Sequence, residues 1–238
     1  MAILFRSKKN KIPLGIYVHV PFCRSKCQYC DFYSVANKED KLMDSFLDAV
    51  CAHIKEAGSL APGYKVDTVY FGGGTPSFFG TEGIATILTT LRRNFDVDNN
   101  AEITVECNPD SVTDRLLHRL RAEGFNRISL GVQSTDDALL QEIGRIHTFS
   151  QVTDAVAAAR MAGFSNISLD LIYGLPNQTL EQWQDTVRTA AALEAEHISC
   201  YGLKVEEGTP LYDYQEYCNL ADDDTQAAMY LSAEEILR

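Results

Sequence analysis

Short apolar segments alternate with longer segments of helical period along most of the chain. The short segments are rich in β-branched and aromatic residues, which favours strands. The longer segments repeat their apolar residues at intervals of three and four, as helices with one buried face do. The predicted strands are residues 15–21, 68–71, 102–106, 127–132, 166–172 and 197–203. The predicted helices are residues 41–56, 83–94, 114–123, 151–162, 180–193 and 224–237.

Six successive strand-helix units predict an α/β fold with one parallel sheet. A complete eight-unit barrel typically takes about 250 residues, and this chain of 238 residues also contains an N-terminal tail and a long loop after its first strand. Six units fit better than eight, so we expect a partial (β/α)6 TIM-like barrel. Residues 1–14 are assigned to the tail and 15–238 to one core domain. Reactive residues of such sheets gather at the carboxyl ends of the strands.

Charge and hydropathy narrow the range of partners. The formal net charge of -12 argues against a nucleic-acid or anionic-membrane partner, because phosphate groups would be repelled. The one basic cluster, Arg6, Lys8, Lys9 and Lys11, is interpreted as a solvated tail. No apolar run approaches the roughly 20 residues of a membrane-spanning helix, and the first residues lack the features of a signal peptide. We therefore expect a cytoplasmic protein with no integral membrane segment.

Three of the seven cysteines, Cys23, Cys27 and Cys30, lie close together in the spacing CxxxCxxC. An odd, unevenly distributed set of cysteines is a poor disulfide framework. Thiolates bind iron-sulfur clusters, zinc or copper(I), so the loop predicts a metal site. A structural zinc ion takes four ligands, and His19 is the available fourth, although a histidine in an alternating strand is more often a hydrogen-bonded residue. We favour a 4Fe-4S cluster with one iron left without a protein ligand, with zinc as the alternative.

Several other residues are interpreted as structural. Trp183 is expected to pack under a helix, and His147 to be a loop residue. The acidic run at 222–224 predicts a helix N-terminal cap, because negative charge there complements the helix dipole. The scattered cysteines are expected to behave as small hydrophobic residues: Cys51, Cys107, Cys200 and Cys218.

The cysteine loop, with Tyr29 before its last cysteine, resembles the signature of the radical S-adenosylmethionine (SAM) superfamily. Further motifs follow in the order found in one branch, which contains oxygen-independent coproporphyrinogen III dehydrogenase and the HemW haem chaperones. They are YVHVPF at 17–22, GGGTP at 72–76, ECNP at 106–109, GVQS at 131–134, GRIH at 144–147 and DLIYGLP at 170–176. The resemblance implies that Cys23, Cys27 and Cys30 hold a 4Fe-4S cluster whose open iron chelates SAM.

These motifs also suit ligand binding by their own chemistry. Glycines at 72–74 let the backbone approach a ligand closely. Glu106 and Asp170 end strands and can accept from hydroxyl or amino groups, while Arg145 suits a carboxylate. The resemblance implies that nine positions contact SAM: Tyr17, Tyr29, Gly73, Gly74, Thr75, Glu106, Gln133, Arg145 and Asp170.

Position 32 discriminates between the two functions of the branch. The dehydrogenases typically carry CxxxCxxCxC, whereas Cys30 is followed here by Asp31 and Phe32. A phenylalanine side chain cannot donate, ligate or exchange protons. GVQS, GRIH and the string EEGTP at 206–210 also look more like the chaperones. We therefore expect a haem chaperone that delivers haem to target proteins, with the dehydrogenase as the alternative.

The same resemblance implies the partners: SAM, haem or a porphyrin, an electron donor protein and a haem-accepting protein. It assigns no catalytic residue. Relatives continue into a C-terminal domain that carries a His-Asn-x-x-Tyr-Trp haem motif, and we expect that domain to be absent from this chain. No haem ligand is therefore assigned.

Overall fold

The computed structural model describes residues 11–36 and 39–238. Arg6, Lys8 and Lys9 of the basic cluster lie outside the described residues, as does most of the 1–14 tail. Lys11 is described, and its ammonium group pairs with Asp96 Oδ2 at 2.9 Å. The first strand begins at Ile12, earlier than the sequence pattern predicts.

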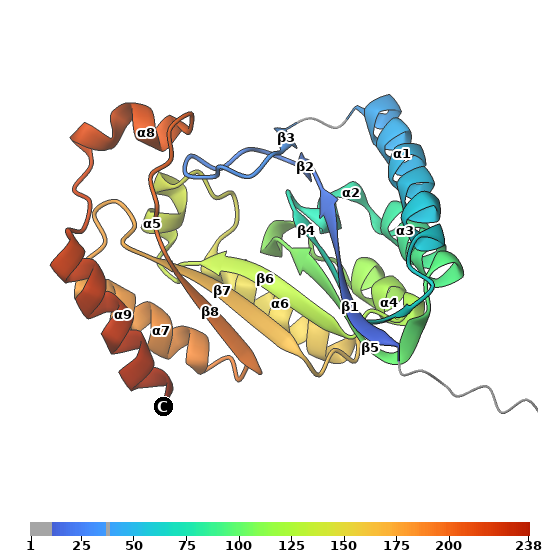
Figure 1. Ribbon diagram of the computed structural model, residues 1–238. Coiled ribbons are helices and arrows are strands. Elements are labelled where there is room, and N and C mark those ends of the chain that lie inside the picture. The colour runs from blue at the N-terminus through green and yellow to red at the C-terminus, as the bar shows by residue number, and fades with distance from the viewer. Residues whose placement is uncertain (1–10, 37–38) are drawn as a thin grey trace, which may run out of the picture.

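Six parallel strands form one sheet that curls into a half-barrel (Figure 1). Neighbouring strands follow one another in chain order: β1 (Ile12–Val20), β4 (Tyr64–Gly73), β5 (Val97–Cys107), β6 (Arg127–Gln133), β7 (Ile167–Tyr173) and β8 (His197–Gly202). All six predicted strands are present. The expected partial (β/α)6 barrel is confirmed.

Six long helices lie on the outer side of the curled sheet, and they match the six predicted helices apart from a few residues at their ends. They are α1 (Asp40–Ser59), α3 (Thr81–Asn94), α4 (Asp114–Glu123), α6 (Phe149–Met161), α7 (Leu180–Ala191) and α9 (Asp223–Leu237). Asp222 caps α9 by accepting from Thr225 N at 2.8 Å, and Asp223 and Asp224 lie in its first turn, so the predicted cap is confirmed. Within the described part of the chain, no helix is long and apolar enough to cross a membrane.

Several short elements at the carboxyl edge were not predicted. They are the helices α2 (Pro76–Phe79), α5 (Asp137–Glu142) and α8 (Pro210–Tyr214), the 3-10 turns η1 (Pro109–Ser111) and η2 (Gln215–Tyr217), and a ribbon of β2 (Phe22–Cys23) and β3 (Val35–Ala36). These elements are too short to show a period in the sequence.

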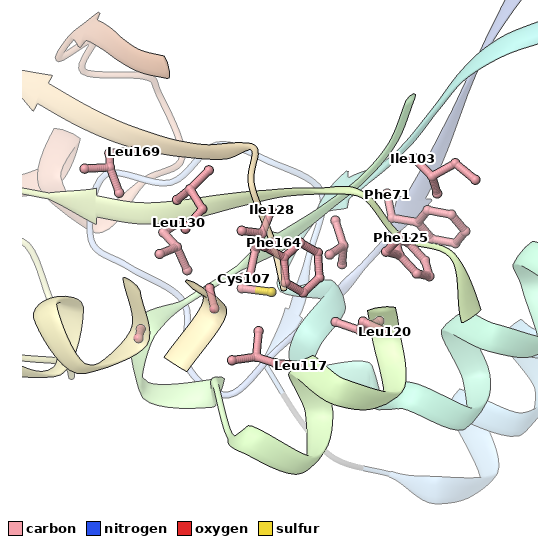
Figure 2. Packing of buried hydrophobic residues seen from close by; sticks show 14 of the residues in the cluster. Phe71, Ile103, Cys107, Leu117, Leu120, Phe125, Ile128, Leu130, Phe164 and Leu169 are labelled. Carbon is pink, nitrogen blue, oxygen red and sulfur yellow. The ribbon is translucent and has the colours of Figure 1, made fainter. Parts of the chain in front are cut away.

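The apolar core lies between the outer face of the sheet and the long helices. Alternate residues of each strand point toward the helices, because successive side chains of a strand face opposite sides. Figure 2 shows this layer, in which the rings of Phe71 and Phe125 pack at 5.2 Å between centroids. Cys107 belongs to the same layer, and burial raises the pKa of its thiol to about 12. Its predicted role in packing is confirmed.

The remaining packing predictions are largely confirmed. Trp183 is fully buried, and its indole Nε1 donates to Met229 O at 2.8 Å. Cys51 and Cys200 are partly buried against the core. Cys218 is also partly buried, but it lies outside the apolar clusters of the described residues. Its predicted role as a packing residue is therefore not confirmed.

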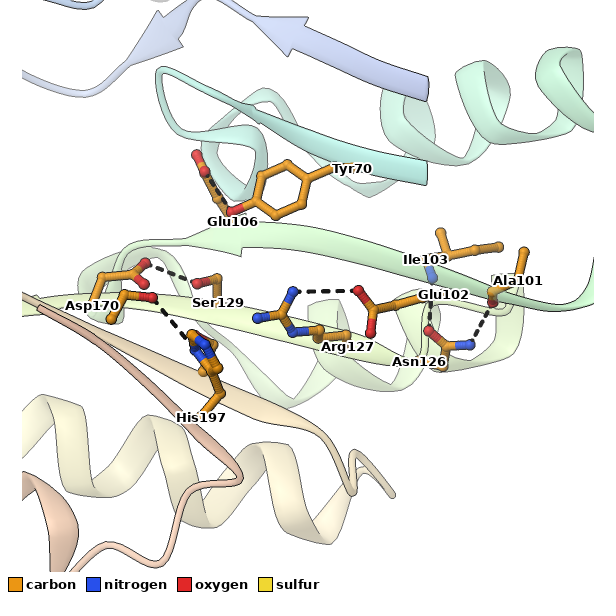
Figure 3. Close-up of polar contacts among 12 residues, drawn as sticks. Tyr70, Ala101, Glu102, Ile103, Glu106, Asn126, Arg127, Ser129, Asp170 and His197 are labelled. Atoms are coloured by element: carbon orange, nitrogen blue, oxygen red, sulfur yellow. Dashed lines mark hydrogen bonds and ion pairs between the residues drawn. The ribbon is translucent and has the colours of Figure 1, made fainter. Parts of the chain in front are cut away.

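The inner face of the sheet is polar. Arg127 Nη1 donates to Glu102 Oε1 at 3.3 Å (Figure 3). Ser168 Oγ lies 2.9 Å from His197 Nδ1. In a closed eight-stranded barrel this face is filled mainly by bulky branched apolar side chains. The polar lining of the half-barrel therefore suits a ligand cavity better than a packed core.

Candidate cofactor site

The cysteine loop begins at the end of β1 and docks on the turn that follows β4. Gly74 N donates to Val20 O at 2.8 Å, and Thr75 N donates to Phe22 O at 2.7 Å. Because β1 and β4 are parallel neighbours, the turn after β4 meets the start of the loop at the carboxyl edge of the sheet. This places the first cysteine, Cys23, at that edge.

The tip of the same loop is held by elements from much later in the chain. Gln28 N donates to Ile143 O at 3.1 Å, just after α5. Gln28 O accepts from Leu211 N of α8 at 2.9 Å. Figure 1 shows the segment running from β2 toward α5 and α8. The loop is thus fixed beside its first cysteine and between its second and third cysteines.

Two of the three thiols receive polar contacts from the surrounding edge. The Thr75 hydroxyl donates to Cys23 Sγ at 3.6 Å, and Arg145 Nη1 donates to Cys27 Sγ at 3.7 Å. Cys30 is partly buried, and burial raises the pKa of its thiol. All three are free cysteines. Hydrogen bonds to cluster sulfurs are one of the features that set the potential of an iron-sulfur site.

The donor set fits a 4Fe-4S cluster. A single metal ion draws all its ligands to one point, whereas the thiolates of a cluster bind different irons. Three free thiols on one short loop, with N–H and O–H donors directed at two of the sulfurs, suit the cluster.

Gly73 and Gly74 have no side chains, and other parts of the protein occupy some of the space that this leaves. A Cβ at Gly74 would lie 2.7 Å from Phe22 O and 3.0 Å from Cys23 Sγ. Gly73 has a φ of +113°, and a Cβ there would lie 2.6 Å from the His19 ring. The sequence predicts that a ligand approaches these glycines closely. In the structure, the cysteine loop occupies some of the space beside them.

Glu106 and Asp170 lie on the inner face near the carboxyl ends of β5 and β7 (Figure 3). Glu106 accepts from the Tyr70 hydroxyl at 2.8 Å and from Gly73 N at 3.1 Å. Asp170 Oδ2 accepts from the Ser129 hydroxyl at 2.8 Å. Burial raises the pKa of both carboxyl groups, and these hydrogen bonds oppose the rise. Each carboxylate keeps lone pairs free to accept from a ligand hydroxyl or amino group.

Arg145 and Asn108 connect the glycine turn to the cysteine loop. Arg145 Nη2 donates to Asn108 Oδ1 at 2.9 Å, and Asn108 Nδ2 donates to Thr75 Oγ1 at 3.1 Å. With the contacts of Thr75 and Arg145 to sulfur, one chain of hydrogen bonds runs from Cys23 to Cys27. Sequence reasoning gave Asn108 no role. Its signals were its place in the ECNP motif at 106–109 and its position two residues after Glu106, at the end of a predicted strand.

Gln133 has a strained backbone. Its φ is +66°, and Ser134 N donates to Val132 O at 2.9 Å across it. A γ-turn with a positive φ at its centre is the rare, strained form. Conformations of this kind cost on the order of 1–3 kcal/mol for a non-glycine residue and cluster at ligand clamps and active sites. The register between β6 and β7 also shifts here, between Gly131 and Gln133.

His19 uses both ring nitrogens within the protein. Nε2 lies 2.8 Å from Tyr33 O and must carry the proton, because a carbonyl only accepts. Nδ1 therefore accepts from the Tyr17 hydroxyl at 3.2 Å. The interpretation of His19 as a hydrogen-bonded residue is confirmed, and this arrangement leaves neither nitrogen for a zinc ion.

The two tyrosines predicted to contact SAM lie in different surroundings. Tyr17 is 56% exposed, and its ring stacks on Tyr70 at 6.0 Å between centroids. Since Tyr70 donates to Glu106, Tyr17 stands beside that carboxylate on the inner face. Tyr29 is partly buried against a small apolar cluster that contains Ile143 and Leu175.

The structure brings most of the predicted residues together by direct contact. Thr75 and Arg145 touch the cysteine loop, and Gly73 and Gly74 lie between that loop and Glu106. Asp170 stands further along the same inner face. His147 is a loop residue as predicted, but it is buried and contacts Val132 O.

A parallel half-barrel that carries a three-cysteine loop at its carboxyl edge defines a class of cofactor-binding α/β proteins. The model of the Radical SAM superfamily matches residues 17–190, which include the whole cysteine loop. The chain belongs to the radical SAM superfamily. The cofactors of that family, a 4Fe-4S cluster and SAM, are the cofactors of this chain.

Several of the proteins similar to this chain are named as haem chaperones. Heme chaperone HemW from Haemophilus influenzae is 37% identical over 229 residues, covering 94% of this chain and 59% of that protein. Heme chaperone HemW from Escherichia coli is 38% identical over 198 residues, covering 83% of this chain and 52% of that protein. Among solved structures, coproporphyrinogen III oxidase (HemN) from Escherichia coli superposes with a TM-score of 0.86 and 30% identity, covering 95% of this chain and 52% of that one. This chain spans about half to three-fifths of the length of these proteins.

Glu106 makes stability depend on pH in a definite direction. Because burial raises its pKa in the folded protein, the native state keeps a proton that the unfolded chain, with a glutamate pKa of about 4.3, has released. The free energy of unfolding therefore falls as the pH rises from about 4 through the folded-state pKa, by at most about 1.4 kcal/mol per pH unit.

Urea unfolding of the wild-type and Glu106→Gln proteins, from about pH 4 to about pH 8, measures this contribution. We expect the stability of the wild type relative to the variant to fall with rising pH. Asp170 and all other carboxyl groups are common to both proteins, so their titration largely cancels. A relative stability that rises with pH would contradict the assignment.

Proposed function

We propose that this chain is the cluster-binding and SAM-binding core of a haem chaperone. The observation that carries the proposal is the chain of hydrogen bonds from Cys23 through Thr75, Asn108 and Arg145 to Cys27. It ties the cysteine loop to the residues expected to bind SAM. Support for the chaperone comes from the relatives named HemW, at 37% and 38% identity.

Cys23, Cys27 and Cys30 are the proposed cluster ligands. Three thiolates leave one iron without a protein ligand, where the amino and carboxylate groups of SAM can bind. A reduced 4Fe-4S cluster supplies, when bound, an electron that can break a carbon-sulfur bond of SAM. The protein keeps donors aimed at the ligand sulfurs through Thr75 and Arg145.

The nine predicted contacts are proposed to hold SAM around that open position. Glu106 and Asp170 offer acceptors for amino and hydroxyl groups on the inner face. Gly73, Gly74 and Thr75 form the turn nearest Cys23, and Arg145 brings a positive charge to Cys27. Tyr17, Tyr29 and Gln133 complete the set. Asn108 joins it as a residue that positions Thr75 and Arg145.

The second candidate function is coproporphyrinogen III oxidation, which the structural likeness to HemN favours. Phe32 favours the chaperone. Its side chain is 65% exposed near the cysteine loop, where the dehydrogenase pattern has a cysteine. An exposed aromatic ring can stack on a flat apolar ligand but cannot exchange a proton or a hydrogen atom as a thiol can. Haem or a porphyrin, an electron donor protein and a haem-accepting protein are the proposed partners, and the cytoplasm is the proposed location.

Anaerobic reconstitution tests both parts of the proposal. We expect iron and sulfide in cluster stoichiometry, and a change in the electron paramagnetic resonance signal of the reduced protein when SAM is added. Stoichiometric zinc without iron or sulfide would overturn the cluster assignment. Haem titration of the full-length chain is expected to give saturable binding, and incubation of coproporphyrinogen III with SAM and reductant is expected to give no decarboxylated product. Product formation would reverse the choice between the two functions.

A further inference from the structure

His147 is buried at a point where the sheet is irregular. It lies in the loop between α5 and α6 and is 3% exposed. Its Nε2 is 3.2 Å from Val132 O and carries the proton, because a carbonyl only accepts. Nδ1 is buried and has no hydrogen-bond partner among the described residues. Burial lowers the pKa of the ring to about 4, so it is neutral near pH 7 and keeps one N–H to donate.

The loop that carries His147 contacts two successive carbonyl groups of β6. Arg145 Nη2 donates to Gly131 O at 2.6 Å, and His147 Nε2 donates to Val132 O. These are the carbonyls next to the register shift between β6 and β7. Val132 O is also the acceptor of the strained γ-turn around Gln133. Arg145 and His147 thus hold the backbone immediately before the strained residue.

The strained turn directs the Gln133 side chain back over Gly131. A Cβ at Gly131 would lie 2.9 Å from Gln133 Nε2, 3.2 Å from Arg145 Nη2 and 3.2 Å from Asn108 Oδ1. The Gln133 amide nitrogen, Arg145 Nη2 and Asn108 Oδ1 therefore all border the space above Gly131 that the missing side chain leaves. Without a positive φ at Gln133, its side chain would leave the backbone in a different direction.

We propose that His147 is a positioning residue for SAM: by donating to Val132 O it holds the γ-turn that directs the Gln133 amide over Gly131. This inference rests on the proposed role of Gln133 as a SAM contact. A buried aliphatic residue would fill the same volume without leaving Nδ1 unpaired. The N–H on Nε2 holds Val132 O in the strained γ-turn, and the bulk of the ring alone would not.

A double-mutant cycle on the reconstituted protein tests the inference. His147→Phe keeps an aromatic ring and removes the donor, whereas His147→Gln can return an amide N–H near the position of Nε2. Each is made in the wild-type and Gln133→Ala backgrounds. SAM affinity is measured from the electron paramagnetic resonance signal of the reduced cluster. Hydrogen exchange of the Ser134 amide is measured without SAM.

We expect His147→Phe to weaken SAM binding about tenfold and to speed Ser134 exchange, with His147→Gln restoring both within about twofold. In the Gln133→Ala background, His147→Phe is expected to cause no further loss of affinity. An equal loss in both backgrounds would overturn the inference, since His147 would then act independently of Gln133.

The exchange measurement separates this inference from the proposed function. If the wild-type protein does not bind SAM, the proposed function fails. Unchanged Ser134 exchange in His147→Phe would overturn the role of His147 in holding the γ-turn as well. If His147→Phe fails to fold, His147→Gln carries the test. A tenfold loss of SAM affinity in that donor-bearing variant would overturn the inference.

Discussion

Replacement of Cys27 by alanine is expected to abolish SAM binding. The proposed cluster would keep only two thiolate ligands, which cannot hold the same iron arrangement. The substitution would also remove the sulfur that accepts from Arg145 Nη1 at 3.7 Å, so the guanidinium would lose its contact with the cysteine loop. Iron and sulfide analysis of the anaerobically reconstituted variant should show substoichiometric iron. Addition of SAM should leave the residual paramagnetic signal unchanged.

Cys51→Ala is the matched control for this prediction. Cys51 lies on α1, and its Sγ contacts Thr90 Oγ1 at 3.5 Å, away from the cysteine loop. Loss of one partly buried thiol should cost about 1 kcal/mol of stability and leave cluster content and SAM affinity intact. Full SAM affinity in the Cys27→Ala protein would refute the ligand assignment.

Gly74→Ala is expected to displace the cysteine loop and prevent cluster assembly. The added Cβ would meet Phe22 O at 2.7 Å, Phe22 N at 2.9 Å and Cys23 Sγ at 3.0 Å. Two of these three atoms belong to the backbone and cannot rotate away, so the loop itself must shift. Overpacking of this kind costs about 1–3 kcal/mol. The larger consequence is that Gly74 N and Thr75 N would lose their hydrogen bonds to Val20 O and Phe22 O.

The control for the glycine substitution is Gly63→Ala. A Cβ at Gly63 would meet no atom within 4 Å, so its stability should stay within about 0.5 kcal/mol of the wild type and its cluster content should be unchanged. Thermal unfolding of the three proteins gives the stability differences, and iron analysis gives cluster occupancy. Normal cluster content in Gly74→Ala would show that the loop does not depend on this close approach.

The fold was predictable because its six strands and six long helices each carry a period that local sequence can show. Phe71, Ile103 and Leu130 are buried on one side of the sheet while their neighbours face the other. The amino-acid sequence of the strands shows this alternation directly. The short helices α2, α5 and α8 could not be predicted in this way. Each has six residues or fewer and is fixed by tertiary contacts, such as the bond from Leu211 N to Gln28 O.

The cysteine spacing alone predicts a metal site, whereas the other candidate residues could be predicted as a set only from motifs that resemble a family pattern. Arg145 and Cys27 are 118 positions apart in the chain, and nothing local in the sequence predicts that they meet. Asn108 was overlooked because its importance lies in bridging Thr75 and Arg145, which only the folded chain brings together. The strain at Gln133 was invisible for a similar reason: a positive φ at a glutamine is imposed by its neighbours and not by its own preference.

The docking of the loop tip on α8 has a consequence for biosynthesis. Gln28 and its partner Tyr214 are separated by 186 positions, and at ribosomal rates of about 5–20 residues per second the later one follows on the order of ten to forty seconds after the first. For that interval the tip of the cysteine loop lacks its contact with α8. An iron donor that recognises the docked loop tip can therefore act only after α8 has been translated.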